Sequence, residues 1–202
     1  MNDAIEQAVA ALRAGQPVVL PTDTVYGLCA DPERPEPARR VSRLKGRDEL
    51  QPIALIARDL NHLLESVPEL RGRVEAILRA LLPGPYTLVV ANPARRYPWL
   101  AGANPETIGI RVPELPPASA AVLDRVGVIA ATSANVHRGR DPRRVEDVSE
   151  EIRSGCGAIV DAGELPGVPS TVLDLTGDPR VLREGAVPAA EALERVSAVA
   201  VP

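Results

Sequence analysis

The chain has 202 residues and a net charge of −4, with hydrophobic residues at 45% and aromatic residues at only 2%. The acidic balance argues against a domain that wraps duplex nucleic acid, and the shortage of aromatic side chains argues against a protein that stacks on single-stranded bases. Because domains commonly hold roughly 100–200 residues, we expect a single domain over residues 1–202.

Predicted helices and strands alternate along most of the chain. Amphipathic spacing predicts a short helix capped by Asp59 and longer helices over residues 3–14, 37–44, 68–81, 117–125, 145–153 and 188–197. Short apolar runs predict strands over residues 17–21, 53–57, 86–91, 108–112, 127–131, 158–160, 171–175 and 181–183. A polar loop is expected over residues 22–27, and a turn over 176–179 joins the last two strands into a hairpin. This order predicts a layered α/β domain with a mixed sheet.

The first segment whose side chains could bind a ligand is PTDTVYGL, residues 21–28, which directly follows a predicted strand. Ligands of open α/β sheets bind at the carboxyl ends of strands. Thr24 and Tyr26 are therefore candidates for holding a small polar substrate. Spacing alone favours the plainer interpretation, a connecting loop in which Thr22 and Asp23 act as caps.

The second segment is a cluster of basic residues in a chain whose net charge is negative, and it ends in Lys45-Gly46-Arg47. On extended backbone after a helix end, Lys45 and Arg47 would point the same way. A lysine and an arginine together suit a polyphosphate, since the arginine can bind two oxygens and the lysine supplies a point charge. On charge alone, a solvated basic surface explains these residues equally well.

The third segment places Arg111 inside the apolar strand 108–112. A buried arginine needs an anionic partner because an isolated charge is very costly to bury. A substrate carboxylate would serve as that partner. The alternative, an edge strand with Arg111 in water, fits the strand's alternation equally well.

The fourth segment runs from a buried strand into Thr132-Ser133-Ala134-Asn135. Small side chains let a ligand approach the backbone, and Ser133 and Asn135 can hydrogen-bond phosphate or ribose oxygens. The alternative is that Ser133 or Asn135 caps a helix or a turn.

The fifth segment is the late hairpin, in which Ser170 precedes one strand and Arg183 closes the next. Hairpin pairing would bring these two residues together. Arg183 could then reach a phosphate or stack on a nucleobase. The alternative is a salt bridge from Arg183 to Glu184 or another nearby acid.

Several site classes are excluded or disfavoured by what the sequence contains. The two cysteines, Cys29 and Cys156, lie far apart, and His62 and His137 are the only histidines. We therefore expect no disulfide framework, no zinc site and no catalytic triad, although Mg²⁺ can enter with a nucleotide. No Walker loop occurs, and no secretory signal or run of about 20 apolar residues is present. We expect a cytoplasmic protein without membrane partners.

Taken in order, these segments resemble the YrdC family of threonylcarbamoyl-AMP synthases, over about residues 5–187. Residues 21–28 resemble its P-T-[DE]-T-x-Y-G-L signature, and Lys45-Gly46-Arg47 its K-x-R motif. Further similar segments are LPGPYT (82–87), IRVP (110–113), TSAN (132–135), STVLD (170–174) and LREG (182–185). The chain departs from the family's S-A-N-x-S-G at His137 and Arg138.

The resemblance implies a fold and a reaction. The fold is a twisted, open, mixed sheet flanked by helices around a basic concave cavity. The reaction joins ATP, L-threonine and bicarbonate, usually with Mg²⁺, to give threonylcarbamoyl-adenylate and pyrophosphate, and partner proteins then carry the product to tRNA.

The resemblance also assigns roles to individual residues. Lys45 and Arg47 would hold the triphosphate and serve catalysis. The remaining residues divide between a threonine side (Thr24, Tyr26, Arg111, with Ser170 near the junction) and an adenylate side (Ser133, Asn135, Arg183). Two alternatives remain: a relative that binds nucleotide or RNA without this activity, and a transferase that handles carbamoyl-adenylate.

Overall fold

The computed structural model describes residues 2–199. Its strands are β1 Val18–Pro21, β2 Tyr26–Ala30, β3 Ala54–Ala57, β4 Tyr86–Ala91, β5 Thr107–Arg111, β6 Val128–Ser133, β7 Ala158–Ile159, β8 Thr171–Asp174 and β9 Arg180–Arg183. Within the described residues these strands form one nine-stranded sheet in the order β7-β1-β2-β6-β3-β5-β4-β8-β9. Both parallel and antiparallel pairs occur, so the predicted mixed sheet is confirmed.

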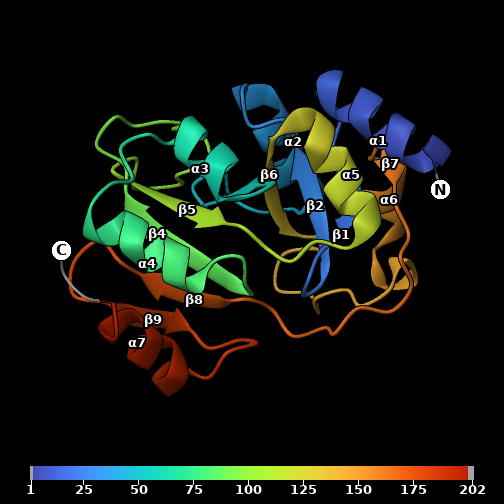
Figure 1. The fold of residues 1–202 in the computed structure, drawn as a ribbon. Coiled ribbons are helices and arrows are strands. Elements are labelled where there is room, and N and C mark those ends of the chain that lie inside the picture. Colours follow the sequence, from blue (N-terminus) through green and yellow to red (C-terminus); the bar gives the residue numbers. More distant parts are fainter. Residues whose placement is uncertain (1, 200–202) are drawn as a thin grey trace.

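Helices pack on both faces of this sheet (Figure 1). They are α1 Asn2–Arg13, α2 Pro35–Leu44, α3 Leu60–Ser66, α4 Arg73–Leu81, α5 Pro117–Val126, α6 Glu150–Ser154 and α7 Ala189–Ser197. None of these helices, within residues 2–199, has the length and apolarity needed to span a membrane.

The two faces of the sheet are covered unequally, and this creates the site. Helices α1 and α5 pack on one face through Leu12 and Val122, above β1, β2 and β6. Helices α2, α3, α4 and α7 contribute to the larger core, which lies on the other face and includes Leu28, Leu55 and Leu88. Over β3, β5, β4 and β8, no helix among residues 2–199 covers the face shared with α1 and α5, and cavity residues line it instead.

Three sequence predictions about elements need correction. The loop expected over residues 22–27 ends early, because β2 begins at Tyr26. All five residues of β2 are buried, but they include glycine, alanine and cysteine, which carry little strand signal. The helix predicted over 145–153 is divided into a 3₁₀ turn, Val145–Asp147, and α6, because Ser149 caps a new helix with its side chain. The helix predicted over 68–81 begins only at Arg73.

Two other predictions are confirmed. Asp59 caps α3 by accepting a hydrogen bond from the backbone N–H of His62. Strands β8 and β9 form the predicted antiparallel hairpin.

Thr171, which is fully buried, ties β8 to the segment that leads into α7. Its hydroxyl donates to the carbonyl oxygen of Val187 at 2.6 Å and accepts from the backbone N–H groups of Val187 at 3.0 Å and Gly185 at 3.1 Å. One side chain therefore satisfies three backbone groups.

We expect Thr171→Val to lower the free energy of unfolding by about 2–3 kcal/mol, because it leaves buried polar groups without partners while keeping the side-chain shape. Urea denaturation followed by circular dichroism measures the loss. Ser197→Ala removes a single hydrogen bond from an exposed serine and should stay within about 0.5 kcal/mol of the parent. Equal stabilities of the two variants would contradict the role assigned to Thr171.

Candidate functional site

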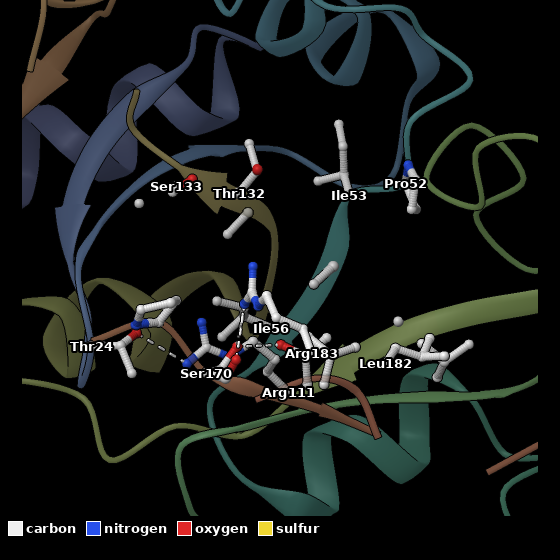
Figure 2. Close-up of a pocket in the computed structure, with 18 of the residues that line it drawn as sticks. Thr24, Pro52, Ile53, Ile56, Arg111, Thr132, Ser133, Ser170, Leu182 and Arg183 are labelled. Atoms are coloured by element: carbon white, nitrogen blue, oxygen red, sulfur yellow. Dashed lines mark hydrogen bonds between the residues drawn. The ribbon is translucent and has the colours of Figure 1, made fainter. Parts of the chain in front are cut away.

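A cavity of about 510 Å³ lies on the uncovered part of the sheet face (Figure 2). Its volume falls in the range of about 300–1,000 Å³ that is usual for small-molecule sites. The strands contribute alternate residues to its floor, and several of these are small, including Ala54, Gly109 and Ala131. Small side chains hollow the sheet surface, so the cavity follows from the sequence of three central strands.

The cavity has a polar end and an apolar end, which Figure 2 shows on opposite sides of the view. The polar end includes side chains from five elements or their ends: Thr24, Arg111, Ser133, Ser170 and Arg183. The apolar lining comes mainly from the segments after α2 and β4 and from β9: Leu50, Pro52, Ile53, Ala101 and Leu182. All five polar residues named here were candidates from the sequence.

Arg111 is buried rather than exposed, and its anionic partner lies within the chain. Its Nη2 donates to Asp23 Oδ1 at 2.7 Å and lies 3.5 Å from Thr24 Oγ1. Burial lowers the pKa of Arg111, and the neighbouring carboxylate of Asp23 opposes that shift. From spacing alone Asp23 is only a possible turn cap, and no local pattern reveals its pairing with Arg111. Instead, the hydroxyl of Thr22 makes the local bonds of the turn.

Ser170 and Arg183 lie together, as the hairpin pairing predicts. Arg183 Nη2 donates to the carbonyl oxygen of Ser170 at 2.9 Å. The Ser170 hydroxyl also lies 2.7 Å from that of Thr87, a cavity residue of β4 that the sequence argument did not single out. The feature of the sequence that points to Thr87 is its place at the end of the LPGPYT segment, which resembles a family motif.

Lys45 lies behind the cavity wall and is the only lysine in the sequence. Its Nζ donates to the carbonyl oxygen of Ser133, to that of Asn135 at 2.7 Å and to Asn135 Oδ1 at 2.8 Å. All three donors of the ammonium group therefore hold the end of β6. Burial and the nearby Arg47 lower the pKa of Lys45 to about 7, although the carboxylate of Asp141 acts in the opposite direction.

Neither Arg47 nor Lys45 is among the described lining residues of the cavity, but Arg47 differs from Lys45 in its hydrogen bonding. Arg47 Nη1 lies 3.4 Å from Thr132 Oγ1, a cavity-lining hydroxyl. Its Nε and Nη2 are buried and make no hydrogen bond within residues 2–199. Burial lowers the pKa of Arg47 to about 10. The extended backbone expected for this segment is wrong, since Lys45 is helical and Gly46 has φ of 60°. The left-handed glycine nevertheless lets both side chains reach the end of β6.

Asn135 and Tyr26 do not line the cavity among the described residues. The side-chain amide of Asn135 donates to the carbonyl oxygen of Gly139 and fixes the loop after β6. Tyr26 lies on the opposite sheet face from Gly27, and its hydroxyl bonds Asp161 and Gly163. Both residues brace loops next to the cavity.

The departure from the family pattern lies on the outer side of this loop. His137 and Arg138 are exposed, and neither lines the cavity. Arg138 has φ of 63°, a left-handed conformation that suits glycine better than arginine. A glycine here, as in the S-A-N-x-S-G pattern that this segment resembles, would adopt the same backbone without strain.

The described part of the chain has no cluster of metal-binding side chains. Residues 2–199 contain no group of three or more histidine, cysteine, aspartate or glutamate side chains placed to hold an ion. Asp141 is the one carboxylate among the described cavity-lining residues.

Comparison with known proteins decides the family. A family model for Sua5, YciO and YrdC proteins, described as "Telomere recombination", matches residues 10–185. The chain belongs to the Sua5/YciO/YrdC family. The family predicted from the ordered motifs is therefore confirmed.

Curated relatives of the Sua5/YciO/YrdC family match nearly the whole chain. The threonylcarbamoyl-AMP synthase of Bacillus subtilis is 32% identical over 186 residues, which cover 91% of this chain and 54% of the relative. The putative threonylcarbamoyl-AMP synthase of Mycobacterium tuberculosis (strain H37Rv) is 34% identical over 185 residues, covering 91% and 84%. The chain thus spans about half the length of the Bacillus relative and most of the Mycobacterium relative.

Solved structures of the Sua5/YciO/YrdC family confirm the fold class. Pyrococcus abyssi Sua5 complexed with L-threonine matches with a TM-score of 0.86 and 30% identity, covering 96% of this chain and 57% of Sua5. Escherichia coli YciO matches with a TM-score of 0.82 and 27% identity, covering 93% and 92%. The shared fold is the twisted mixed sheet flanked by helices, whereas the predicted basic character of the cavity stays a prediction.

The lowered pKa of Lys45 can be measured directly, because ¹³C-labelled lysine gives a single Cε signal from this chain. We expect a titration midpoint near pH 7 rather than near 10. Between about pH 7 and 10.5 the unfolded chain then binds more protons than the folded one, so stability rises with pH by at most about 1.4 kcal/mol per unit. Lys45→Met should remove that part of the pH dependence. A midpoint near pH 10 would contradict the assignment.

Proposed function

We propose that this protein is an L-threonylcarbamoyladenylate synthase. It would be a nucleotidyltransferase that makes threonylcarbamoyl-AMP and pyrophosphate from ATP, L-threonine and bicarbonate, for the threonylcarbamoyladenosine modification of tRNA. The names of the curated relatives and the threonine complex of Sua5 support this proposal.

The observation that carries the proposal is the unsatisfied guanidinium of Arg47 beside the cavity wall. Two buried nitrogens of a cation without partners are expensive, and an anion that binds there would satisfy both. A triphosphate supplies several oxygens for such a planar donor. Lys45 would contribute to the same site by fixing the end of β6, and by its charge.

The polar end of the cavity suits the amino acid. Arg111 presents a buried guanidinium for a carboxylate, and Thr24 and Ser170 add hydroxyl groups within the same wall. Tyr26 would act by bracing the loop opposite Thr24. Ser133 and Arg183 would hold the adenylate part, with the nucleobase directed to the apolar end. Asn135 would act by bracing the loop after β6.

The reaction needs positioning more than a protein nucleophile. Threonine and bicarbonate lose water to give a carbamate, whose oxygen attacks the α-phosphorus of ATP. A new P–O bond forms, the bond to the β-phosphate oxygen breaks, and pyrophosphate leaves with the electron pair. Cationic and hydroxyl groups fixed around the phosphate chain neutralise the charge that develops, which is a large source of catalysis.

Further parts of the proposal concern Mg²⁺, partners and location. Mg²⁺ would arrive with ATP and screen the phosphates, and Asp141 is the lining carboxylate that could contact it or its waters. Because the product is destined for tRNA, the partners are tRNA-modification proteins, and the cytoplasm is the compartment that holds them with ATP.

The direct test is pyrophosphate release by purified protein with ATP, L-threonine, bicarbonate and Mg²⁺. We expect release to require threonine and bicarbonate together. A protein that binds ATP but releases no threonine-dependent pyrophosphate would instead be a nucleotide- or RNA-binding relative. If pyrophosphate release follows carbamoyl phosphate rather than threonine, the protein would be a transferase that handles carbamoyl-adenylate.

Arg47→Met should weaken ATP binding without lowering the stability of the protein. Loss of a buried, poorly paired cation should leave stability equal or higher, while loss of charge-assisted hydrogen bonds should weaken ATP binding about 10–100-fold. Thermal unfolding and isothermal titration with ATP measure the two effects. Arg43→Met, which removes an exposed arginine paired with Glu36, is the matched control and should change ATP affinity less than about twofold. Equal ATP affinity in both variants would remove Arg47 from the phosphate site.

A further inference from the structure

Asp23 is held in a rigid turn between β1 and β2. The Thr22 hydroxyl donates to the carbonyl oxygen of Val25 at 2.7 Å and accepts from the backbone N–H groups of Thr24 and Val25, each at 3.2 Å. From outside the turn, the backbone N–H of Gly167 donates to the carbonyl oxygen of Thr24 at 2.8 Å. With the turn bonded on both sides, the carboxylate of Asp23 has a defined position.

That carboxylate forms a buried ion pair with Arg111. The side chains of Arg111 and Asp23 are 10% and 9% exposed, and a single bond of 2.7 Å joins Arg111 Nη2 to Asp23 Oδ1. Asp23 Oδ2 and Arg111 Nε are both buried without a partner among the described residues. A pair buried for stability alone should have its remaining donors and acceptors satisfied, because desolvation otherwise exceeds the attraction between the charges.

The two members of the pair stand in different relations to the cavity. Arg111 lines it, whereas Asp23 is not among the described lining residues, so the carboxylate acts on a ligand through its neighbours. These are the guanidinium of Arg111 and the hydroxyl of Thr24, which donates to Asp23 Oδ1 at 3.3 Å. Burial raises the pKa of Asp23, and the charge of Arg111 opposes that rise, as expected for a carboxylate that depends on this one cation.

We propose that Asp23 is a positioning residue for the amino-acid substrate. It fixes the orientation of the Arg111 guanidinium, so that the remaining nitrogens of the fork face a carboxylate in the polar end of the cavity. The inference rests on the proposed function, since it takes L-threonine as the ligand of Arg111. It predicts that threonine affinity depends on the charge of Asp23 while ATP affinity does not.

The test is isothermal titration of L-threonine and, separately, of ATP into the full chain and its variants. Asp23→Asn keeps the size of the side chain but removes its charge, and should weaken threonine binding at least tenfold while changing ATP binding less than threefold. Asp23→Glu restores the charge and should recover most of the threonine affinity. Where turnover is measured, the threonine KM should rise more than kcat falls.

Asp174→Asn is the matched control. Asp174 is also 9% exposed on its side chain and paired with an arginine, Arg180, but it lies outside the cavity lining. Its variant should bind threonine like the parent. The positioning role is wrong if Asp23→Asn binds threonine as tightly as the parent, or if its affinities for threonine and ATP fall by the same factor. The proposed function stands in both cases. If the parent chain itself binds no threonine, the proposed function fails, and this inference fails with it.

Discussion

The site depends on one packing constraint: α1 and α5 cover only half of a sheet face. Where they lie, the face is closed by Leu12 and Val122. Beyond them, the same alternation along β3, β5 and β4 exposes small and polar residues to a cavity. The floor of the cavity is therefore part of the sheet, and the hydrogen-bonded ladder fixes it without help from flexible loops.

Three basic side chains lie at or near this floor, and their hydrogen bonding differs in an informative way. Lys45 has three acceptors for its three donors, Arg111 has one carboxylate, and Arg47 leaves two buried nitrogens free. Lys45 therefore stabilises the end of β6 in the folded chain, whereas Arg47 has nitrogens that a ligand would hydrogen-bond. Arg111 lies between these extremes, because an internal anion holds it while part of its fork stays available.

The sequence predicted most of the architecture but missed the element next to the site. Long periodic segments such as α1 and α5 were recognisable, and so was the hairpin with its turn at residues 176–179. Strand β2 was missed because strand propensity describes a half-buried pleated surface, and a fully buried central strand of small residues does not show it. The register of β2 also decides that Gly27 faces the cavity while Tyr26 faces the other core.

By itself, the sequence determined the family, the mixed α/β class and the candidate residues, because ordered motifs and hydrophobic periodicity are local properties of the chain. It could not determine which candidates meet. The contact between Asp23 and Arg111 joins residues 88 positions apart, and that between Lys45 and Asn135 joins residues 90 positions apart. Only the tertiary structure decided these contacts, because strand order and register set them. Burial decides whether the guanidinium donors of Arg111 bond to water, to Asp23 or to a ligand, and no local sequence pattern specifies burial.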